Sequence, residues 1–171
     1  HPSASPGALS FATVIKDDGQ VGGSAAYDAT HGSACIWSTK GFTALPNLPT
    51  FGTDSTLYGI AKDGTACGSL FGNFPGRRAG LWAGGTVTSI GSLPGYPSDV
   101  VAWGMNDFGM IIGHSYNATI QRSHAFAYKN GVMQDLGSLP GPRDDSFAFD
   151  VNSQGVVVGY SYGQDGWRPF R

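Results

Sequence analysis

The sequence predicts an all-β fold built from repeated, β-propeller-like units. Glycine pairs of the form G-x-x-x-G recur at intervals of 45, 45 and 46 residues, at Gly19/Gly23, Gly64/Gly68, Gly109/Gly113 and Gly155/Gly159. Short apolar stretches flank every pair, and no segment sustains the periodicity of an amphipathic helix. A fixed period of this size indicates one supersecondary unit copied along the chain. One such unit cannot bury its apolar faces alone, so the core must form between stacked neighbours.

Each unit divides into four short segments that have the composition of β-strands. The first segments span 11–15, 56–60, 101–105 and 147–151, and the second span 20–24, 65–69, 110–115 and 156–161. Asn, Asp and Gly between them favour tight turns, so these two segments form a hairpin. The third segments follow an Ala-x-x-Trp or Ala-x-x-Tyr pattern at 34–37, 79–82 and 125–128, and 167–171 begins a fourth copy. The last segments span 42–45, 86–90 and 132–136.

Four short antiparallel strands per unit match the blade of a β-propeller. We expect a single repeat domain over residues 1–171, with units at approximately 10–54, 55–99, 100–145 and 146–171. The fourth unit stops in its third segment, so the sequence predicts about four blades, of which the last is incomplete. A ring with one thin blade is the preferred architecture. An open stack that is completed by oligomerisation is the alternative.

The composition excludes several classes of partner. Charged residues make up 13% of the chain and the formal net charge is −2, whereas nucleic acid and anionic membranes select clustered Lys and Arg. No apolar run approaches the roughly 18 residues of a membrane span, so membrane insertion is not expected. Low charge with many Gly, Ser, Thr and aromatic residues is common in secreted all-β proteins, which favours an extracellular location. Cys35 and Cys67 occupy different repeat positions and form either one disulfide or two buried thiols.

One stretch of the third unit carries a family resemblance. The stretch begins with His124-Ala125-Phe126 and Tyr128 and continues with Asn130-Gly131-Val132-Met133-Gln134-Asp135-Leu136-Gly137. It is followed by the segment 148–161, which contains Asn152, Gly155 and Gly159. This pattern resembles the extracellular HAF repeat of bacterial proteins. The resemblance covers essentially the whole chain and is weaker in the first two units, where Ser33 and Arg78 replace the histidine. It implies a secreted or surface β-repeat protein and brings no established catalytic motif.

No catalytic motif stands out in the sequence. G-x-S-x-G, H-E-x-x-H, P-loop and C-x-x-C patterns are all absent, and the chain contains no Glu. Each turn carries only one or two carboxylates and none has the spacing of a calcium loop, so no metal and no cofactor is expected. Catalytic residues are therefore not assigned. An extracellular hydrolase with a single site is the alternative function, and its nominated residues are His114, Ser115 and Asp150.

The sequence supports recognition of a ligand better than it supports catalysis. The third segments place a polar residue before the Ala or Pro and an aromatic residue after it, and aromatic faces stack on sugar rings while adjacent donors fix their orientation. The candidate ligand-binding residues are Trp37, Arg78, Trp82, His124, Tyr128, Tyr160, Trp167 and Arg168. In the competing interpretation Trp37 and Trp82 pack between blades. Tyr58, Trp103 and Phe149 share the repeat position of Thr13 and are expected in the core.

The sequence thus favours a secreted, lectin-like binding or adhesion module that recognises a glycan or cell-surface ligand at repeated sites. Repetition raises avidity even when each site is weak. A third hypothesis is a structural or assembly module whose unfinished blade is completed by a partner chain, for example in a homo-oligomer.

Overall fold

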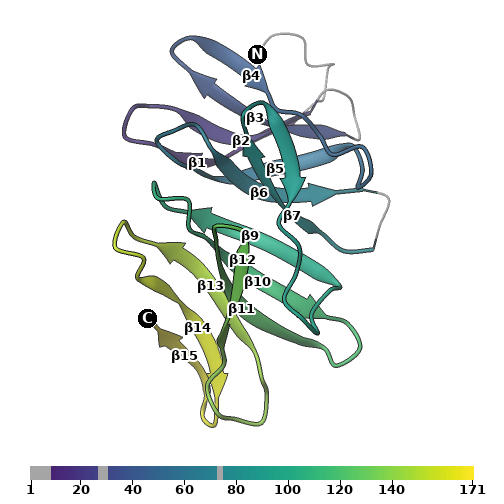
Figure 1. The fold of residues 1–171 in the computed structure, drawn as a ribbon, viewed down its shortest axis with the longest axis vertical. Coiled ribbons are helices and arrows are strands. Elements are labelled where there is room, and N and C mark those ends of the chain that lie inside the picture. Colours follow the sequence, from purple (N-terminus) through teal and green to yellow (C-terminus); the bar gives the residue numbers. More distant parts are fainter. Residues whose placement is uncertain (1–8, 27–30, 73–74) are drawn as a thin grey trace.

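The computed structural model describes residues 9–26, 31–72 and 75–171, and these residues form 15 β-strands and no helix (Figure 1). The strands make four antiparallel sheets, in each of which every strand pairs with its neighbour in sequence. The all-β prediction is confirmed. The four-segment division of the repeat is also reproduced, because three sheets have four strands and the last has three.

The strands of each sheet follow one another along the chain. The first sheet contains β1 (Ser10–Ile15), β2 (Val21–Ala26), β3 (Gly32–Ser38) and β4 (Gly41–Ala44). The second contains β5 (Asp54–Ile60), β6 (Ala66–Phe71), β7 (Arg78–Ala83) and β8 (Thr86–Ser89). The third contains β9 (Asp99–Met105), β10 (Ile111–Asn117), β11 (Arg122–Lys129) and β12 (Val132–Gly137). The fourth contains β13 (Ser146–Val151), β14 (Val157–Gly163) and β15 (Gly166–Phe170).

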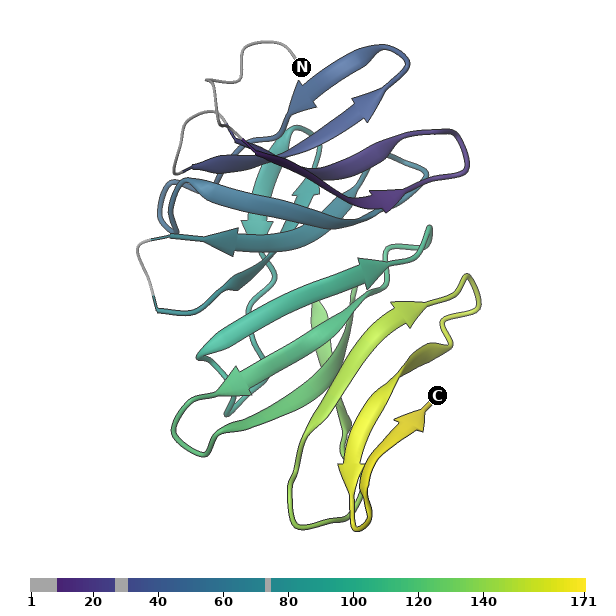
Figure 2. The same ribbon diagram turned by 180° about the vertical axis from the view of Figure 1, so that it is seen from behind.

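Consecutive sheets stack on one another along the long axis of the molecule (Figures 1 and 2). β3 packs against β5, β6 against β9, and β10 against β13. The first strands of the four sheets, β1, β5, β9 and β13, also contact one another in turn. The first and fourth sheets lie at opposite ends of the array in both views, and no sheet closes on itself.

The G-x-x-x-G pairs mark a bulged hairpin in every sheet. Between the first and second strands the register slips by one residue, which leaves Thr13, Tyr58, Trp103 and Phe149 as the extra residues of four equivalent bulges. The first glycine of a pair lies in the turn with positive φ, for example +73° at Gly109. The second admits the bulged backbone, because a Cβ at Gly113 would lie 1.8 Å from the carbonyl oxygen of Val101.

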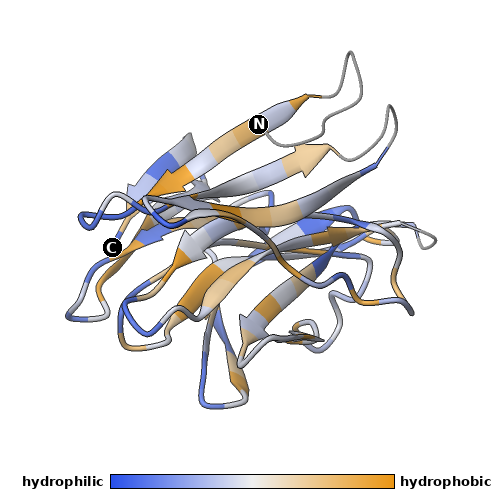
Figure 3. Cartoon of the chain, turned by 90° about the horizontal axis from the view of Figure 1, so that it is seen from above, coloured by the Kyte–Doolittle hydropathy of each residue, from blue (hydrophilic) through white to orange (hydrophobic). Residues whose placement is uncertain are grey.

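The core lies between the sheets and consists of three buried clusters. Ala34 and Leu57 belong to the cluster between the first and second sheets, Ala79 and Ala102 to the next, and Ala125 and Ala148 to the last; all six side chains are fully buried. Figure 3 shows apolar residues alternating with polar ones along the strands and polar residues in many connecting turns. Alternation of this kind is expected because successive side chains of a strand point to opposite faces.

Cys35 and Cys67 are buried free thiols and are not joined by a disulfide. Burial raises the pKa of both thiols, that of Cys35 to about 12, so neither is a reactive thiolate at neutral pH. Of the two alternatives that the sequence left open, the structure has the buried thiols.

A carboxylate from the start of each later sheet holds the third strand of the sheet before it. Asp54 Oδ1 accepts a hydrogen bond from Gly32 N at 2.6 Å, and Asp145 Oδ1 accepts one from Ser123 N at 2.9 Å. Asp99 accepts the equivalent bond from the backbone N–H of Arg77. Within the described residues no helix is long and apolar enough to cross a membrane.

Candidate ligand-binding site

The bulged residues of three sheets form a contiguous row of aromatic rings, called here the aromatic row: Tyr58, Trp103 and Phe149. The ring centroids of Tyr58 and Trp103 lie 5.1 Å apart, and those of Trp103 and Phe149 lie 6.2 Å apart. The prediction that this repeat position lies in the core holds only in part: Trp103 is half-buried and packs against the cluster between the third and fourth sheets, whereas Tyr58 is half-buried and Phe149 is 41% exposed. The reason is the bulge, which interrupts the strict alternation of the strand and re-aims the side chain.

His114 and Phe147 fill the space beside the aromatic row. Trp103 Nε1 donates to His114 Nδ1 at 3.0 Å, and the His114 ring meets the edge of Phe147 at 4.7 Å between centroids. Burial, helped by the charge of Arg77, lowers the pKa of His114 to about 4. The imidazole is therefore neutral at pH 7, and because Nδ1 accepts a hydrogen bond, its proton resides on Nε2.

Two further rings of the fourth sheet extend the aromatic row beyond Phe149. Phe149 contacts Tyr160 at 5.0 Å between centroids, and Tyr160 meets Trp167 edge to face at 4.6 Å. Tyr160 is 38% exposed and Trp167 is 48% exposed. Together with Arg168 and Pro169 they line a shallow surface hollow. Tyr160 and Trp167 are both among the candidate ligand-binding residues of the sequence analysis, and both lie at the surface.

An ion pair lies close to the aromatic row. Arg77 Nη2 donates to Asp99 Oδ2 at 2.6 Å and Arg77 Nε donates to Asp99 Oδ1 at 3.1 Å. Burial alone would raise the pKa of Asp99, but the hydrogen bonds and charge of Arg77 hold it below its ordinary value. The same guanidinium acts electrostatically on Tyr58 and His114. Both partners line an open hollow of about 650 Å³ with Phe71, Gly72, Gly76 and Tyr116.

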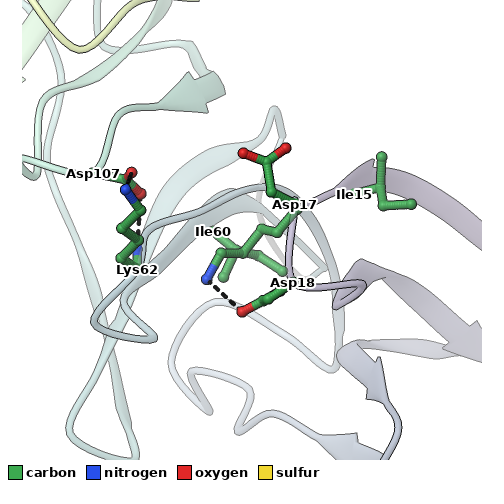
Figure 4. A pocket seen from close by; sticks show the side chains of 7 residues that line it. Ile15, Asp17, Asp18, Ile60, Lys62 and Asp107 are labelled. Carbon is green, nitrogen blue, oxygen red and sulfur yellow. Dashed lines mark hydrogen bonds and ion pairs between the residues drawn. The ribbon is translucent and has the colours of Figure 1, made fainter.

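A second hollow, of about 310 Å³, lies among the hairpin turns of the first three sheets (Figure 4). Lys16 Nζ lies 3.4 Å from Asp18 Oδ2, and Lys62 Nζ lies 3.2 Å from Asp107 Oδ2. Both lysines of this hollow are thus paired with carboxylates, and no aromatic side chain lines it. Over the part of the chain that the structure describes, no three His, Cys or Asp side chains gather as metal ligands.

The predicted third-strand residues do not gather into one site. Trp82 is 3% exposed and its Nε1 donates to Pro46 O at 2.8 Å, as the packing interpretation predicts. Trp37 is half-buried beside Phe42, and Tyr128 is half-buried against the cluster between the second and third sheets. Arg78 donates to the carbonyl oxygens of Arg77 and Ser98. Trp82 and Tyr128 thus pack against the clusters between sheets, and Arg78 is bonded to neighbouring backbone.

His124 is held by its neighbours on both ring nitrogens. Its Nδ1 lies 2.8 Å from Asp135 Oδ2, and its Nε2 lies 3.1 Å from Asp144 Oδ2 and 3.0 Å from Tyr96 Oη. The ring also stacks on Tyr96 and is 8% exposed. Sequence reasoning proposed His124 as a ligand donor, but its hydrogen-bonding positions are occupied within the protein. Of the eight predicted residues, Tyr160, Trp167 and Arg168 are brought together.

The nominated hydrolase residues do not form a relay. Ser115 is buried, and its Oγ donates to Tyr96 O at 2.6 Å and accepts from Leu93 N at 3.2 Å. His114 is adjacent in β10, so its side chain points to the opposite face of the sheet. The exposed Asp150 accepts from Val151 N at 2.8 Å.

The aromatic row and the Arg77–Asp99 pair are the features that sequence reasoning missed as a site. A sequence signal for the row exists, since Thr13, Tyr58, Trp103 and Phe149 each stand ten residues before the second glycine of their repeat. Comparison of the chain with protein-family models, curated proteins and solved structures gave no match.

Proposed function

We propose that this chain is a carbohydrate-binding module of propeller-like architecture, and that its ligand lies along the aromatic row. The observation that carries the proposal is the repeated bulge, which brings one ring from each of three successive sheets into a contiguous row that ends at the exposed Phe149. Stacked antiparallel sheets with adjacent first strands are the arrangement of propeller blades. The resemblance to the bacterial HAF repeat supports an extracellular setting for such a module.

The chemistry of the row suits a sugar. Aromatic faces attract the C–H faces of pyranose rings, and planar charged groups at the side bind neighbouring hydroxyls. Arg77 supplies donors and Asp99 supplies acceptors, and both are partly accessible, with side-chain exposures of 33% and 17%. Because the two charges cancel, the site favours an uncharged ligand over an anionic or cationic one.

The aromatic row remains partly accessible to solvent although the sheets stack on one another. The third sheet stacks on the second, which contains Tyr58, and the fourth stacks on the third, which contains Trp103. Neither side chain is fully buried by this stacking. Most other inward positions of the same strands, such as Leu57 and Ala102, are fully buried. In the second and third sheets this position thus keeps partial access beside a sealed neighbour, which is a feature of a binding surface more than of a core.

A glycan-array screen with matched variants tests the proposal. We expect the wild-type chain to bind uncharged glycans, and Phe149→Ala to weaken that binding about ten-fold, since an aromatic contact contributes up to about 1.5 kcal/mol. The control is Phe108→Ala, which removes another exposed ring, 63% accessible, from a hairpin turn outside the row. Silence of the wild-type protein across the array, or equal losses in the two variants, would contradict the proposal.

A further inference from the structure

His114 has one ring nitrogen that no other described group uses. Trp103 Nε1 donates to its Nδ1 at 3.0 Å, so the proton of the neutral ring lies on Nε2. Among residues 9–26, 31–72 and 75–171, no hydrogen-bond partner of Nε2 is found. The side chain is only 6% exposed, and a donor in such surroundings needs an acceptor, because an unmade hydrogen bond of a buried group costs free energy.

The Nε2 atom of His114 remains reachable from solvent. Within the described part of the chain, Ser69 Oγ is the one side-chain nitrogen or oxygen atom that is both sealed from solvent and without a partner. Nε2 also lacks a partner, so it belongs to the atoms that keep contact with solvent. An accessible donor on an otherwise enclosed ring is available to an atom of a ligand.

The neighbours of His114 bring this donor close to the open hollow that Arg77 and Asp99 line. Tyr116 lies two residues further along β10, so its side chain is on the same face of the strand, and it lines the same hollow opposite Asp99 in the register of β9 and β10. Besides burial, the charges of Arg77 and Asp99 both act on the pKa of His114, in opposite directions. The two ring nitrogens point away from one another, so Nε2–H is directed away from Trp103.

The imidazole occurs once at this repeat position. The residue that follows the second glycine of each pair is Ser24, Ser69, His114 or Tyr160. The rings of the aromatic row are thus repeated, whereas the nitrogen donor is not. This arrangement is expected if the rings supply contact area and one polar group fixes the position of the ligand.

We propose that His114 determines the specificity of the ligand site by donating its Nε2–H to an oxygen atom of the bound ligand, and that Trp103 is its positioning residue because it holds Nδ1. This inference rests on the proposed function and names the chemistry at one point of the ligand. Since the neutral ring only donates at Nε2, the matching atom is a hydroxyl, ring or glycosidic oxygen of an uncharged sugar. The ammonium group of an amino sugar has donors only and does not match.

A first measurement needs no ligand. In nitrogen-15 NMR spectra at pH 7, Nε2 of His114 is expected to carry the proton and Nδ1 to lack it, and the resonances are assigned by their absence in His114→Gln. Trp103→Phe removes the donor to Nδ1, so the ring of that variant should lose its preference for the Nε2–H form. A wild-type ring with its proton on Nδ1, or with protons on both nitrogens, overturns the inference.

Glycan-array binding of three His114 variants then separates contact with the ligand from support of Trp103. The amide nitrogen of a glutamine takes the place of Nε2, whereas the amide oxygen of an asparagine takes the place of Nδ1. We expect His114→Gln to keep binding within about three-fold, and His114→Asn and His114→Phe to lose about ten-fold, the equivalent of one hydrogen bond. Retention in His114→Asn with loss in His114→Gln would assign a purely supporting role and overturn the inference.

The control is His124→Gln, which removes another buried histidine of the same sheet, 8% exposed and paired with Asp135 and Asp144. It should bind glycans like the wild-type chain, and circular dichroism verifies that every variant is folded. Binding that His114→Phe leaves unchanged overturns this inference and leaves the proposed function intact. Silence of the wild-type chain across the array contradicts the proposed function and the ligand contact together, whatever proton position the NMR spectra show.

Discussion

The carbonyl oxygen of Val101 occupies the space where a side chain on Gly113 would begin, since a Cβ there would lie 1.8 Å from it. The same relationship joins Phe11 to Gly23, Thr56 to Gly68 and Phe147 to Gly159, at 1.8 to 2.0 Å. The second glycine of each pair is thus required by the bulge, and the bulge in turn aims the aromatic row.

Gly113→Ala should therefore be far more damaging than Gly109→Ala. The added methyl group at Gly113 meets backbone that cannot move aside, and we expect a loss of at least about 3 kcal/mol in the free energy of unfolding. Gly109 has positive φ but open space around it, so its substitution costs about 1 kcal/mol. Urea unfolding of both variants measures the difference, and equal losses would show that the close approach is not structural.

His114 should make the stability of the protein depend on pH. Its pKa of about 4 in the folded state lies below the unfolded value, so the unfolded chain binds the proton more tightly. Stability is full above the unfolded pKa and falls as pH drops toward the folded one, by about 2 kcal/mol between pH 7 and pH 5. Unfolding measured at the two pH values should lose most of this difference in His114→Gln, whose side chain does not titrate.

Asp145 should be the most sensitive of the carboxylates that join the sheets. It is 3% exposed and accepts hydrogen bonds from Ser123 N and from Arg143 Nε, both at 2.9 Å. Asp145→Ala leaves a buried N–H without a partner, and we expect a loss of about 3 kcal/mol. Asp145→Asn retains an acceptor for Ser123 and should lose about 1 kcal/mol. Thermal unfolding distinguishes the two, and comparable losses would argue against a role for the backbone hydrogen bond.

Trp82 should matter for stability and not for ligand binding. Trp82→Phe removes the hydrogen bond to Pro46 and some buried area, which should lower the free energy of unfolding by about 2 kcal/mol. The exposed Trp167, at a different repeat position, is the surface control, and Trp167→Phe should leave stability within about 0.5 kcal/mol. Denaturant curves with a glycan-binding assay on each folded variant check both statements. A Trp82 variant that is stable but does not bind would return this residue to the list of ligand contacts.

Much of the fold could be predicted because its signals are local. Turn-forming Asx and Gly residues, short alternating strands and a fixed period of 45 or 46 residues depend on backbone sterics within one repeat. The three strands of the last sheet followed from the same count. Fewer of the site residues could be predicted, because residue type and repeat position do not show that Trp82 and His124 are buried by parts of the chain distant in sequence.

The orientation of the aromatic row could not be predicted from local sequence patterns. In Tyr58, Trp103 and Phe149 the apolar character and the strand position favour burial, and period-two alternation places them inward. The bulge shifts that alternation by one residue, and it is visible only when the register of two paired strands is known.

The sequence by itself determined the all-β class, the repeat, the hairpin turns and the incomplete last unit, because these depend on interactions between residues close together in the chain. The tertiary structure alone decided which aromatic rings remain accessible and which carboxylates join neighbouring sheets. Those outcomes depend on the surface that a neighbouring sheet covers, and Trp82 and Trp167 differ for that reason: one lies under the sheet beside it and the other does not.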